Sequence, residues 1–493
     1  TDNDGNRIEN CTVKRVLYGI YSAGASAANP NTGSVITMND LSATTTDRVR
    51  RVGIVVFNED GIQITENSVG GIDTNESADA IGIGVGTQGM DATTTASGGV
   101  TNAFVSRNKV NGVNSASTVG FSAGGIAVAG AAGGANTIVN NMITGVTAPS
   151  TSPDLVAGIF VMGATGSTTQ LYYNAVSMTG DRGTVASQMP SYGIAVTGAD
   201  PTVVSKNNIF YTTQTSGGGV NARSYAIGMV STTFANLDSN YNDFYFSGAN
   251  AGGYRTGSLS AAAGTDYAAL AAWQAAVADD ANSIEADPIF VDPTNDLHID
   301  PSALMVEASP VTGAGTPIAG INIDFDGTLR NPTTPDIGAD EVTPLATILA
   351  SFDAQGGVDR IVVTWETASE LDTAGFNLYR ADNAAGPQTL LAYLPSQAPG
   401  SVQGFAYSYE DLAVQPGQTY WYWLEIVSLG GATTLHGPIS ATMSAPTAVT
   451  VSGMSAGEET GSAALPATSA LLALLLLAGA LVVRRGQQQN RGH

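Results

Sequence analysis

The chain has 493 residues, of which 42 are acidic and 18 are basic, so its formal net charge at pH 7 is −24. This charge opposes binding to nucleic acid or to an anionic membrane surface, and we expect no nucleic acid partner. The single cysteine, Cys11, excludes an internal disulfide framework and a metal site built from several cysteines. We expect Cys11 to be a small buried residue rather than a nucleophile, because none of the three histidines lies near it in the sequence.

Two motifs recur with a common period of about 33 residues through the first half of the chain. One is a Gly-Ile-x-Val-like strand, whose isoleucine recurs as Ile20, Ile54, Ile83, Ile126, Ile159, Ile194 and Ile227. The other is an asparagine with Val, Ile, Leu or Phe two residues later, and it recurs at Asn39, Asn67, Asn108, Asn141, Asn174, Asn207 and Asn242. Two interleaved motifs with one period indicate a stacked repeat.

The local pattern decides between helical and β repeats. Apolar residues alternate with period 2 in short stretches rich in Val, Ile and Tyr, bounded by Gly, Asn, Ser and Thr, which predicts strands. Residues 1–255 are therefore predicted to form a β-solenoid with the isoleucines stacked into an internal ladder. We expect the asparagines at corners, where they tolerate left-handed backbone angles and hydrogen-bond to neighbouring peptide groups. Because residues 7–10 already read as repeat, without a preceding methionine or signal segment, we expect further turns upstream.

A series of motifs follows the last repeat, within residues 256–343. They include Leu-Ala-Ala-Trp at 270–273, Asp-Pro-Ile-Phe-Val-Asp-Pro at 287–293, Leu-His-Ile at 297–299, Asp-Phe-Asp-Gly at 324–327 and Asp-Ile-Gly-Ala-Asp-Glu at 336–341. This order resembles the C-terminal end of bacterial surface proteins of the right-handed parallel β-helix family, of the kind named for variable C-terminal anchors. That family also includes pectate-lyase-like enzymes and phage tailspikes. The resemblance implies an all-β fold, with a right-handed parallel β-helix over 1–255 and its end or cap region, containing a short helix, over 256–343.

A second β unit is predicted over residues 346–445, where strand-like stretches recur about every ten residues. The unit resembles a fibronectin type III module, a β-sandwich without catalytic residues. The resemblance implies that Trp365 packs in the core and that Tyr420, with Leu412 and 416–417, forms the tyrosine corner of that fold. We expect its aromatic residues to serve core packing, with carbohydrate binding as the alternative.

The last part of the chain is predicted to be a flexible linker over 446–464 and an anchor over 465–493. The anchor consists of a short motif, an apolar run over 470–483 and a basic pair. The motif is Leu465, Pro466, Ala467, Thr468 and Ser469, and the basic pair is Arg484 and Arg485. Motif, run and basic pair resemble a bacterial sorting signal, although Ser469 stands where the sortase motif has glycine. Residues 465–483 are just long enough for a transmembrane helix. Sortase sorting, exosortase sorting and a plain membrane anchor with a cytoplasmic basic pair remain open, and each leaves the rest of the chain outside the cell.

An enzyme on this fold would need a set of acids on the solenoid. Lyases hold Ca²⁺ with carboxylates and use a Lys or Arg base, whereas hydrolases use two carboxylates. The candidate catalytic residues form one cluster, Asp73, Glu76 and Asp79, followed by Asp91. Such a cluster in a Gly, Asn and Ser-rich loop is more often a solvated edge. A lyase would be favoured if Arg107 or Lys109 lay beside two of these acids.

A second acidic set comprises Asp324, Asp326, Asp336 and Asp340. The Asp-x-Asp-Gly pattern makes Asp324 and Asp326 candidate Ca²⁺ ligands, and no other cofactor is expected. The residues that follow do not continue a calcium loop. We therefore favour an ion pair between Arg330 and one of these acids, which would lock the end of the solenoid.

These features together predict an extracellular protein anchored to the membrane or cell wall by its C-terminus. The spacing from each asparagine motif to the next isoleucine grows along the chain, so extra residues accumulate at one corner, where solenoids present binding faces. We expect a structural or adhesive role, with a polysaccharide or another surface ligand as partner. The alternative is a polysaccharide lyase or glycoside hydrolase acting on the β-helix face.

Overall fold

The structure is a computed structural model that describes residues 3–74, 77–91, 97–116, 121–151, 153–185, 188–218, 222–260, 263–300, 309–342, 349–370, 373–386, 389–399, 401, 403–429, 431 and 433–444. Glu76, the linker, the motif from Leu465 to Ser469 and the pair Arg484 and Arg485 lie outside these residues. Within the described residues, no helix is long and apolar enough to cross a membrane.

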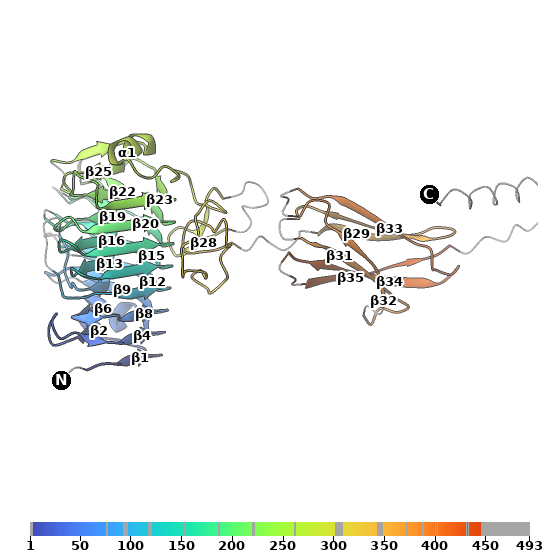
Figure 1. Ribbon diagram of the computed structural model, residues 1–493, viewed down its shortest axis with the longest axis horizontal. Coiled ribbons are helices and arrows are strands. Elements are labelled where there is room, and N and C mark those ends of the chain that lie inside the picture. Colours follow the sequence, from blue (N-terminus) through green and yellow to red (C-terminus); the bar gives the residue numbers. More distant parts are fainter. Residues whose placement is uncertain are drawn as a thin grey trace, which may run out of the picture.

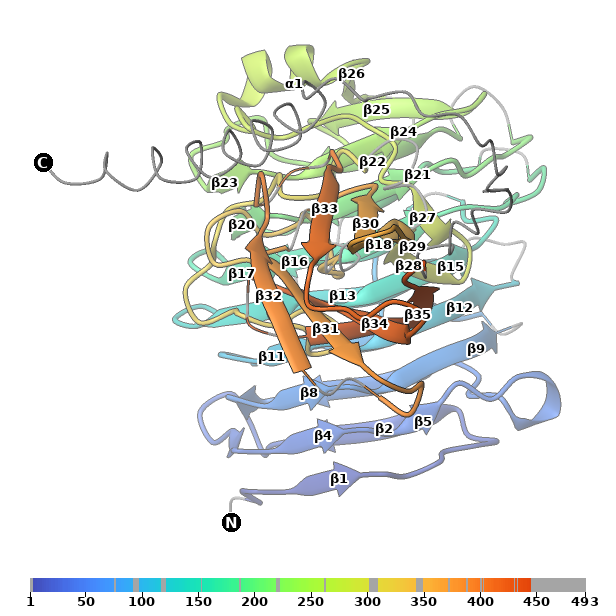
Figure 2. The same cartoon turned by 90° about the vertical axis from the view of Figure 1, so that its right-hand side faces the viewer.

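Three parallel sheets, named A, B and C, make up the first part of the chain (Figures 1 and 2). Sheet A contains β1 (Arg7–Glu9), β4 (Val35–Thr37), β8 (Gln63–Thr65), β11 (Phe104–Ser106), β14 (Ala135–Val139), β17 (Thr168–Tyr172), β20 (Thr202–Lys206) and β23 (Leu237–Asn240). Sheet B contains β5 (Asp40–Leu41), β9 (Ser68–Thr74), β12 (Lys109–Ser115), β15 (Met142–Thr147), β18 (Ala175–Met178), β21 (Ile209–Thr212) and β24 (Asp243–Phe246). Sheet C contains β2 (Tyr18–Ala23), β6 (Val52–Phe57), β10 (Ala80–Val85), β13 (Ala123–Gly130), β16 (Val156–Gly163), β19 (Ser191–Val196), β22 (Ser224–Met229), β25 (Ala251–Thr256) and the antiparallel β26 (Thr265–Tyr267).

The chain visits the sheets in the order A, B, C, and we number its eight turns from β1 onward. Each strand pairs with the strand one turn earlier and one turn later, so the backbone hydrogen bonds run along the stack. Short elements between the sheets are β3 (Asn31–Thr32) paired with β7 (Glu59–Asp60), and the 3-10 helix η1 (Thr45–Asp47). The predicted parallel β-solenoid is therefore confirmed as a fold.

The predicted isoleucine ladder is also confirmed, on the inner face of sheet C. The paired and buried residues are Ile20, Ile54, Ile83, Ile126, Ile159, Ile194 and Ile227. In turn 8 the next position is Tyr254, whose ring stacks on Trp273 with 5.4 Å between centroids. Trp273 lies on α1 (Leu270–Val277), so this helix covers the apolar end of the ladder.

An asparagine ladder follows the corner between sheets A and B. Each side-chain Oδ1 accepts hydrogen bonds from the backbone N–H and the Nδ2 of the asparagine one turn earlier, over 2.9 to 3.1 Å, and the members are Asn39, Asn67, Asn108, Asn141, Asn174, Asn208 and Asn242. Asn207 was predicted at this position of turn 7, and the prediction was wrong by one residue, because Asn208 is the member of the ladder. The left-handed angles belong to the preceding residues, such as Asn140 (φ 53°) and Tyr173 (φ 52°). The ladder asparagines therefore hydrogen-bond, while their neighbours make the turn.

Cys11 occupies the corresponding corner of turn 1, where its backbone N–H donates to Asn39 Oδ1 over 3.0 Å. The prediction that Cys11 is buried is wrong, because its side chain is exposed. A residue in turn 1 has a described neighbouring turn on one side only, and this accounts for the exposure.

The outer face of sheet C carries a second apolar layer, which loops cover. Residues of the sheet and of the covering loops form one buried cluster that includes Val55, Phe160, Tyr192 and Tyr225 with Met90, Leu155 and Leu259. The Tyr192 and Tyr225 rings stack 5.4 Å apart, and the Tyr192 hydroxyl donates to Leu259 O over 2.6 Å. Sheet C is thus packed on both faces, which explains its near-continuous apolar strands.

After α1 the chain turns back along the side of the solenoid (Figure 1). The lateral cap, defined as residues 284–300 and 309–342, contains the antiparallel pair β27 (Phe290–Asp292) and β28 (Asp296–Ile299). It packs on the outer face of sheet B in an apolar cluster that includes Met142, Ala175, Ile209, Phe290, Val311 and Ile337. Parts of the chain that are more than 100 residues apart in sequence are therefore in contact.

Hydrogen bonds fasten the lateral cap to successive turns at the A–B corner. Arg107 Nε donates to Phe325 O over 2.8 Å in turn 4, and Asn140 Nδ2 donates to Ile323 O over 2.8 Å in turn 5. The Tyr173 hydroxyl of turn 6 donates to Thr316 O over 2.8 Å. The left-handed residues of the corner thus point their side chains at the cap.

The remaining strands form two antiparallel sheets. One contains β29 (Leu349–Gly356), β30 (Ile361–Thr367) and β33 (Ala406–Asp411), and the other contains β32 (Thr389–Pro395), β31 (Gly375–Ala381), β34 (Thr419–Val427) and β35 (Thr433–Thr442). Trp365 is buried, as predicted, and its ring stacks 5.3 Å from that of Tyr407. The Tyr420 hydroxyl accepts a hydrogen bond from the Gln415 N–H over 3.3 Å.

Candidate functional site

A shallow groove follows the corner between sheets C and A over turns 1 to 5. It is lined by Tyr21, Ala23, Gly24 and Ala27 of turn 1, Phe57 and Asn58 of turn 2, Gln88 and 97–99 of turn 3, Ala131 and Ala132 of turn 4 and Ala164 of turn 5. Because corner residues of successive turns stack, the groove runs along the solenoid axis. We call it the corner groove.

An aromatic pair stands at one end of the corner groove. The Tyr21 side chain is 57% exposed, and its ring lies 5.8 Å from the half-buried Phe57 ring. The wall opposite is made of small residues. A Cβ atom added to Gly98 would lie 2.5 Å from Phe57 Cδ1, so only glycine lets the turn 3 loop pass so close to this ring.

An acidic hollow adjoins the corner groove and shares Phe57, Gln88, Ser97 and Gly98 with it. The rest of its lining is Asp79, Gly86, Thr87, Gly89, Met90, Asp91 and Met162. Asp79 Oδ2 accepts from the Met90 N–H over 2.8 Å, and its Oδ1 accepts from the Ser122 N–H over 2.9 Å. Burial raises the pKa of Asp79, and the neighbouring Asp91 adds to the rise, while the two N–H donors oppose it. Asp79 ties the turn 3 loop to the start of β13.

Asp154 of turn 5 completes this acidic group. The Ser122 hydroxyl lies 2.6 Å from Met90 O and 3.1 Å from Asp154 Oδ1, and it has one proton to donate. Burial raises the pKa of Asp154 to about 7, and the charge of Asp79 contributes further. A protonated Asp154 can donate to the Ser122 hydroxyl, which leaves the hydroxyl proton for Met90 O.

The structure separates the predicted catalytic residues. Asp73 lies on β9 of sheet B, where it pairs with Arg48 and accepts from Asn114 Nδ2 over 2.9 Å. Asp79 lies across the next corner at the start of β10, and Glu76 is not described. Asp154 was not predicted, and it lies two residues before β16, whereas Asp79 directly precedes β10. Aligning the turns by their isoleucines places Asp79 opposite Leu155, so Asp154 falls one residue away from the position of Asp79.

Neither predicted base reaches two acids of the turns. Arg107 Nη1 pairs with Glu66 over 2.7 Å. Lys109 lines a hollow on sheet B together with uncharged residues, which include Ser42, Thr44, Ser68 and Asn111. The condition that would have favoured a lyase is therefore not met among the described residues.

The candidate Ca²⁺ ligands have other partners. Asp324 is buried and accepts hydrogen bonds from the backbone N–H groups of Asp326, Thr328 and Glu341 over 2.7 to 3.0 Å. Asp326 Oδ2 lies 2.9 Å from His298 Nε2. The two carboxylates thus serve different purposes, since Asp324 closes a turn and Asp326 faces a histidine.

Arg330 forms the predicted kind of ion pair, but with Glu341, at 3.2 Å, rather than with one of the four aspartates. Its guanidinium is buried and stacks 3.9 Å from the centroid of the Tyr173 ring, and Nη2 donates to Asn140 Oδ1 over 2.8 Å. Burial lowers the pKa of Arg330, and Glu341 opposes this shift. Both members of the ion pair belong to the lateral cap, and Arg330 fastens the cap to the solenoid through Tyr173 and Asn140.

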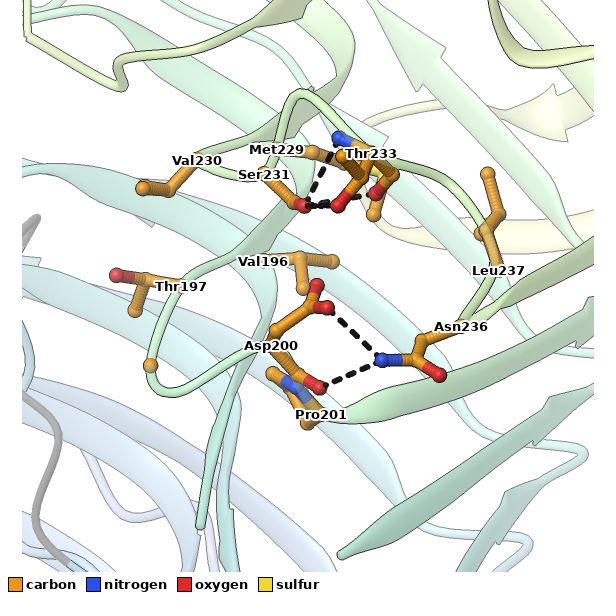
Figure 3. Close-up of a pocket in the computed structure, with 11 residues that line it drawn as sticks. Val196, Thr197, Asp200, Pro201, Met229, Val230, Ser231, Thr233, Asn236 and Leu237 are labelled. Carbon is orange, nitrogen blue, oxygen red and sulfur yellow. Dashed lines mark hydrogen bonds between the residues drawn. The ribbon is translucent and has the colours of Figure 1, made fainter. Parts of the chain in front are cut away.

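A smaller hollow lies at the same corner between turns 6 and 7 (Figure 3). Asn236 Nδ2 donates to Asp200 Oδ2 over 2.9 Å and to Asp200 O over 3.1 Å, and the Ser231 hydroxyl donates to Thr233 O over 2.7 Å. These polar groups bond to one another across the hollow, so the open part of the corner is the groove over turns 1 to 5.

The geometry defines a class of protein: a three-sheeted parallel β-solenoid with a lateral cap, followed by a two-sheet antiparallel unit. No protein-family model and no curated protein matches the chain.

Proposed function

We propose that the protein is an extracellular surface protein that binds an extended glycan chain along the corner groove. The observation that carries the proposal is the groove itself, which crosses five turns and offers the exposed Tyr21 ring beside Phe57. Aromatic rings beside polar groups suit sugar rings, because these have one apolar face and a polar edge. The amides of Asn58 and Gln88 supply hydrogen-bonding groups along the same groove.

The charge of the groove selects the kind of glycan. Asp79 and Asp91 line the adjoining hollow, and no basic residue among those the structure describes lines either part. The chain carries a net charge of −24. A polyanionic chain such as a pectate would be repelled. The proposed ligand is therefore a neutral polysaccharide.

Replacing Tyr21 by alanine is expected to weaken glycan binding by about tenfold, since truncating an aromatic residue that contacts the ligand commonly costs more than about 1 kcal/mol. Neutral and anionic polysaccharides would be screened on an array, and the affinity for the best ligand would be measured by calorimetry. Tyr393→Ala, at a side chain that is 50% exposed on β32, is the matched control. Equal affinities of the two variants would contradict the proposal.

A glycoside hydrolase is the second candidate function, because Ser122 bridges two carboxyl groups. Its N–H donates to Asp79, and its hydroxyl is hydrogen-bonded to Asp154, whose pKa is about 7. Asp154 could serve as the acid, and Asp79, whose carboxylate accepts two backbone N–H groups, as the base. We expect Asp154→Asn to abolish any release of reducing ends from a bound glycan without weakening binding. If the unaltered protein releases no reducing ends from any ligand that it binds, the protein is a binding protein.

The remaining parts of the proposal concern display. We propose that the solenoid is a right-handed β-helix, that residues 349–444 form a fibronectin type III-like spacer and that residues 465–493 anchor the chain to the membrane or cell wall. Two sheets of three and four strands support the spacer. The order of Leu465 to Ser469, an apolar run and Arg484 with Arg485 supports the anchor.

A further inference from the structure

Three side chains of the lateral cap place potential metal ligands together. His298, Asp326 and Asp340 bring one ring nitrogen and two carboxylate oxygens within 4.8 Å of one another. His298 Nε2 and Asp326 Oδ2 are 2.9 Å apart. Two neighbouring ligands of a tetrahedral ion, each about 2.1 Å from it, are separated by about 3.4 Å. This pair is thus within about 0.5 Å of the spacing of neighbouring ligands.

A fourth residue orients the histidine. His298 Nδ1 is hydrogen-bonded to Asp296 Oδ1, two residues earlier on β28. The ring of Phe325 packs edge-on against the imidazole, with 6.0 Å between centroids. A carboxylate on the second nitrogen is the usual support of a metal-binding histidine, because it fixes the ring and directs the other nitrogen to the ion.

The three segments that supply the ligands are held together by bonds that do not involve the ligand atoms facing the site. The Phe325 N–H donates to Ala339 O over 2.8 Å, and the Glu341 N–H donates to Asp324 Oδ2 over 3.0 Å. Asp340 uses Oδ2 to accept the Ile299 N–H over 2.9 Å, which leaves its Oδ1. The site is thus largely formed without an ion.

The site is also open to solvent. The side chain of Asp326 is 55% exposed and that of His298 is 32% exposed. An ion can therefore enter without unfolding the cap, and water can fill the coordination positions that the protein leaves vacant.

We propose that His298, Asp326 and Asp340 bind a Zn²⁺ ion that links β28, the 324–328 turn and the 336–341 segment. One imidazole nitrogen and two carboxylate oxygens suit Zn²⁺, whereas Ca²⁺ takes six to eight oxygen ligands. This site differs from the calcium pair expected from the sequence, because both oxygens of Asp324 already accept backbone N–H groups. The inference does not depend on glycan binding.

The test is calorimetric titration of the chelator-treated full chain with ZnCl₂, MnCl₂ and CaCl₂. We expect one Zn²⁺ per chain at this site, with the affinity for Zn²⁺ lowered at least about tenfold in His298→Ala and in Asp326→Asn. Asp238→Asn removes a carboxylate of sheet A that pairs with Lys206, and it should bind Zn²⁺ as the unaltered protein does. His436→Ala, which removes a histidine of β35, is the second control.

Thermal unfolding gives an independent readout. Zn²⁺ should raise the unfolding midpoint of the unaltered protein and of both controls, but not that of His298→Ala or Asp326→Asn, since a bound ion stabilises only the folded state. Far-UV circular dichroism checks that each variant is folded. Unchanged Zn²⁺ affinity in His298→Ala and Asp326→Asn would overturn the proposal, and so would Ca²⁺ binding with the same stoichiometry in place of Zn²⁺.

Discussion

Replacing Asn141 by alanine is expected to destabilise the solenoid by about 3–5 kcal/mol, because several buried polar groups lose their partners at once. Asn141 is fully buried. Its Oδ1 accepts from the backbone N–H and the Nδ2 of Asn108, each over 3.0 Å, and its Nδ2 donates to Val105 O over 2.9 Å and to Asn174 Oδ1 over 3.0 Å. Alanine removes the acceptor of the buried Asn108 N–H and the side-chain donor to Val105 O, while Asn108 Nδ2 keeps its bond to Ile64 O.

The measurement is urea unfolding followed by circular dichroism. Asn111→Ala is the matched control, since Asn111 is only half-buried, on β12, and its side chain makes one long contact of 3.5 Å with Asn295. We expect the control to lose less than about 1 kcal/mol. If both variants unfold at the same urea concentration, the ladder does not carry the stability assigned to it.

The protein is expected to become more stable on acidification from pH 8 to pH 5. Asp154 and Asp336 have pKa values raised to about 7 by burial, against 3.8 for a free aspartate, so between these values the folded state binds more protons than the unfolded state. The contribution of these two groups to stability is therefore fully present below pH 3.8 and is lost as the pH rises through about 7. The net charge of −24 acts in the same direction, since acidification reduces self-repulsion.

Thermal unfolding at pH 5 and pH 8 checks this expectation, with a midpoint higher by at least about 5 °C at pH 5. The charges that act on Asp154 are those of Asp79 and Asp91, and the Ser122 hydroxyl is its hydrogen-bond partner. Asp154→Asn should reduce the difference between the two midpoints, because an amide imitates the protonated acid. A higher midpoint at pH 8 would show that the sign is wrong.

Much of the solenoid could be predicted from its sequence because the two ladders repeat a residue type at a fixed spacing. The isoleucine positions were all correct, since each follows a glycine, or an alanine in the case of Ile227. Asn207 was chosen over Asn208 because two asparagines are adjacent there, and only the hydrogen bonds show which one is in the ladder. The outer layer over sheet C was not foreseen, because Met90 and Leu259 come from loops without periodicity.

The candidate site was harder to predict. Asp73 and Asp79 are close in sequence, but a corner of the solenoid lies between them, so they belong to different sheets. Asp79 and Asp154 are 75 residues apart and meet through Ser122. In a stacked fold, proximity follows the position within the turn rather than the distance along the chain. The acids therefore had to be compared turn by turn.

The lateral cap also has a mechanical consequence. Its bonds reach Arg107 in turn 4, Asn140 in turn 5 and Tyr173 in turn 6, rather than only the last turn. A pulling force applied to the chain after Val342 is thus shared among several turns and loads their contacts in shear. The solenoid would resist such a force better than one pulled from its terminal strand, where the turns could peel away one at a time.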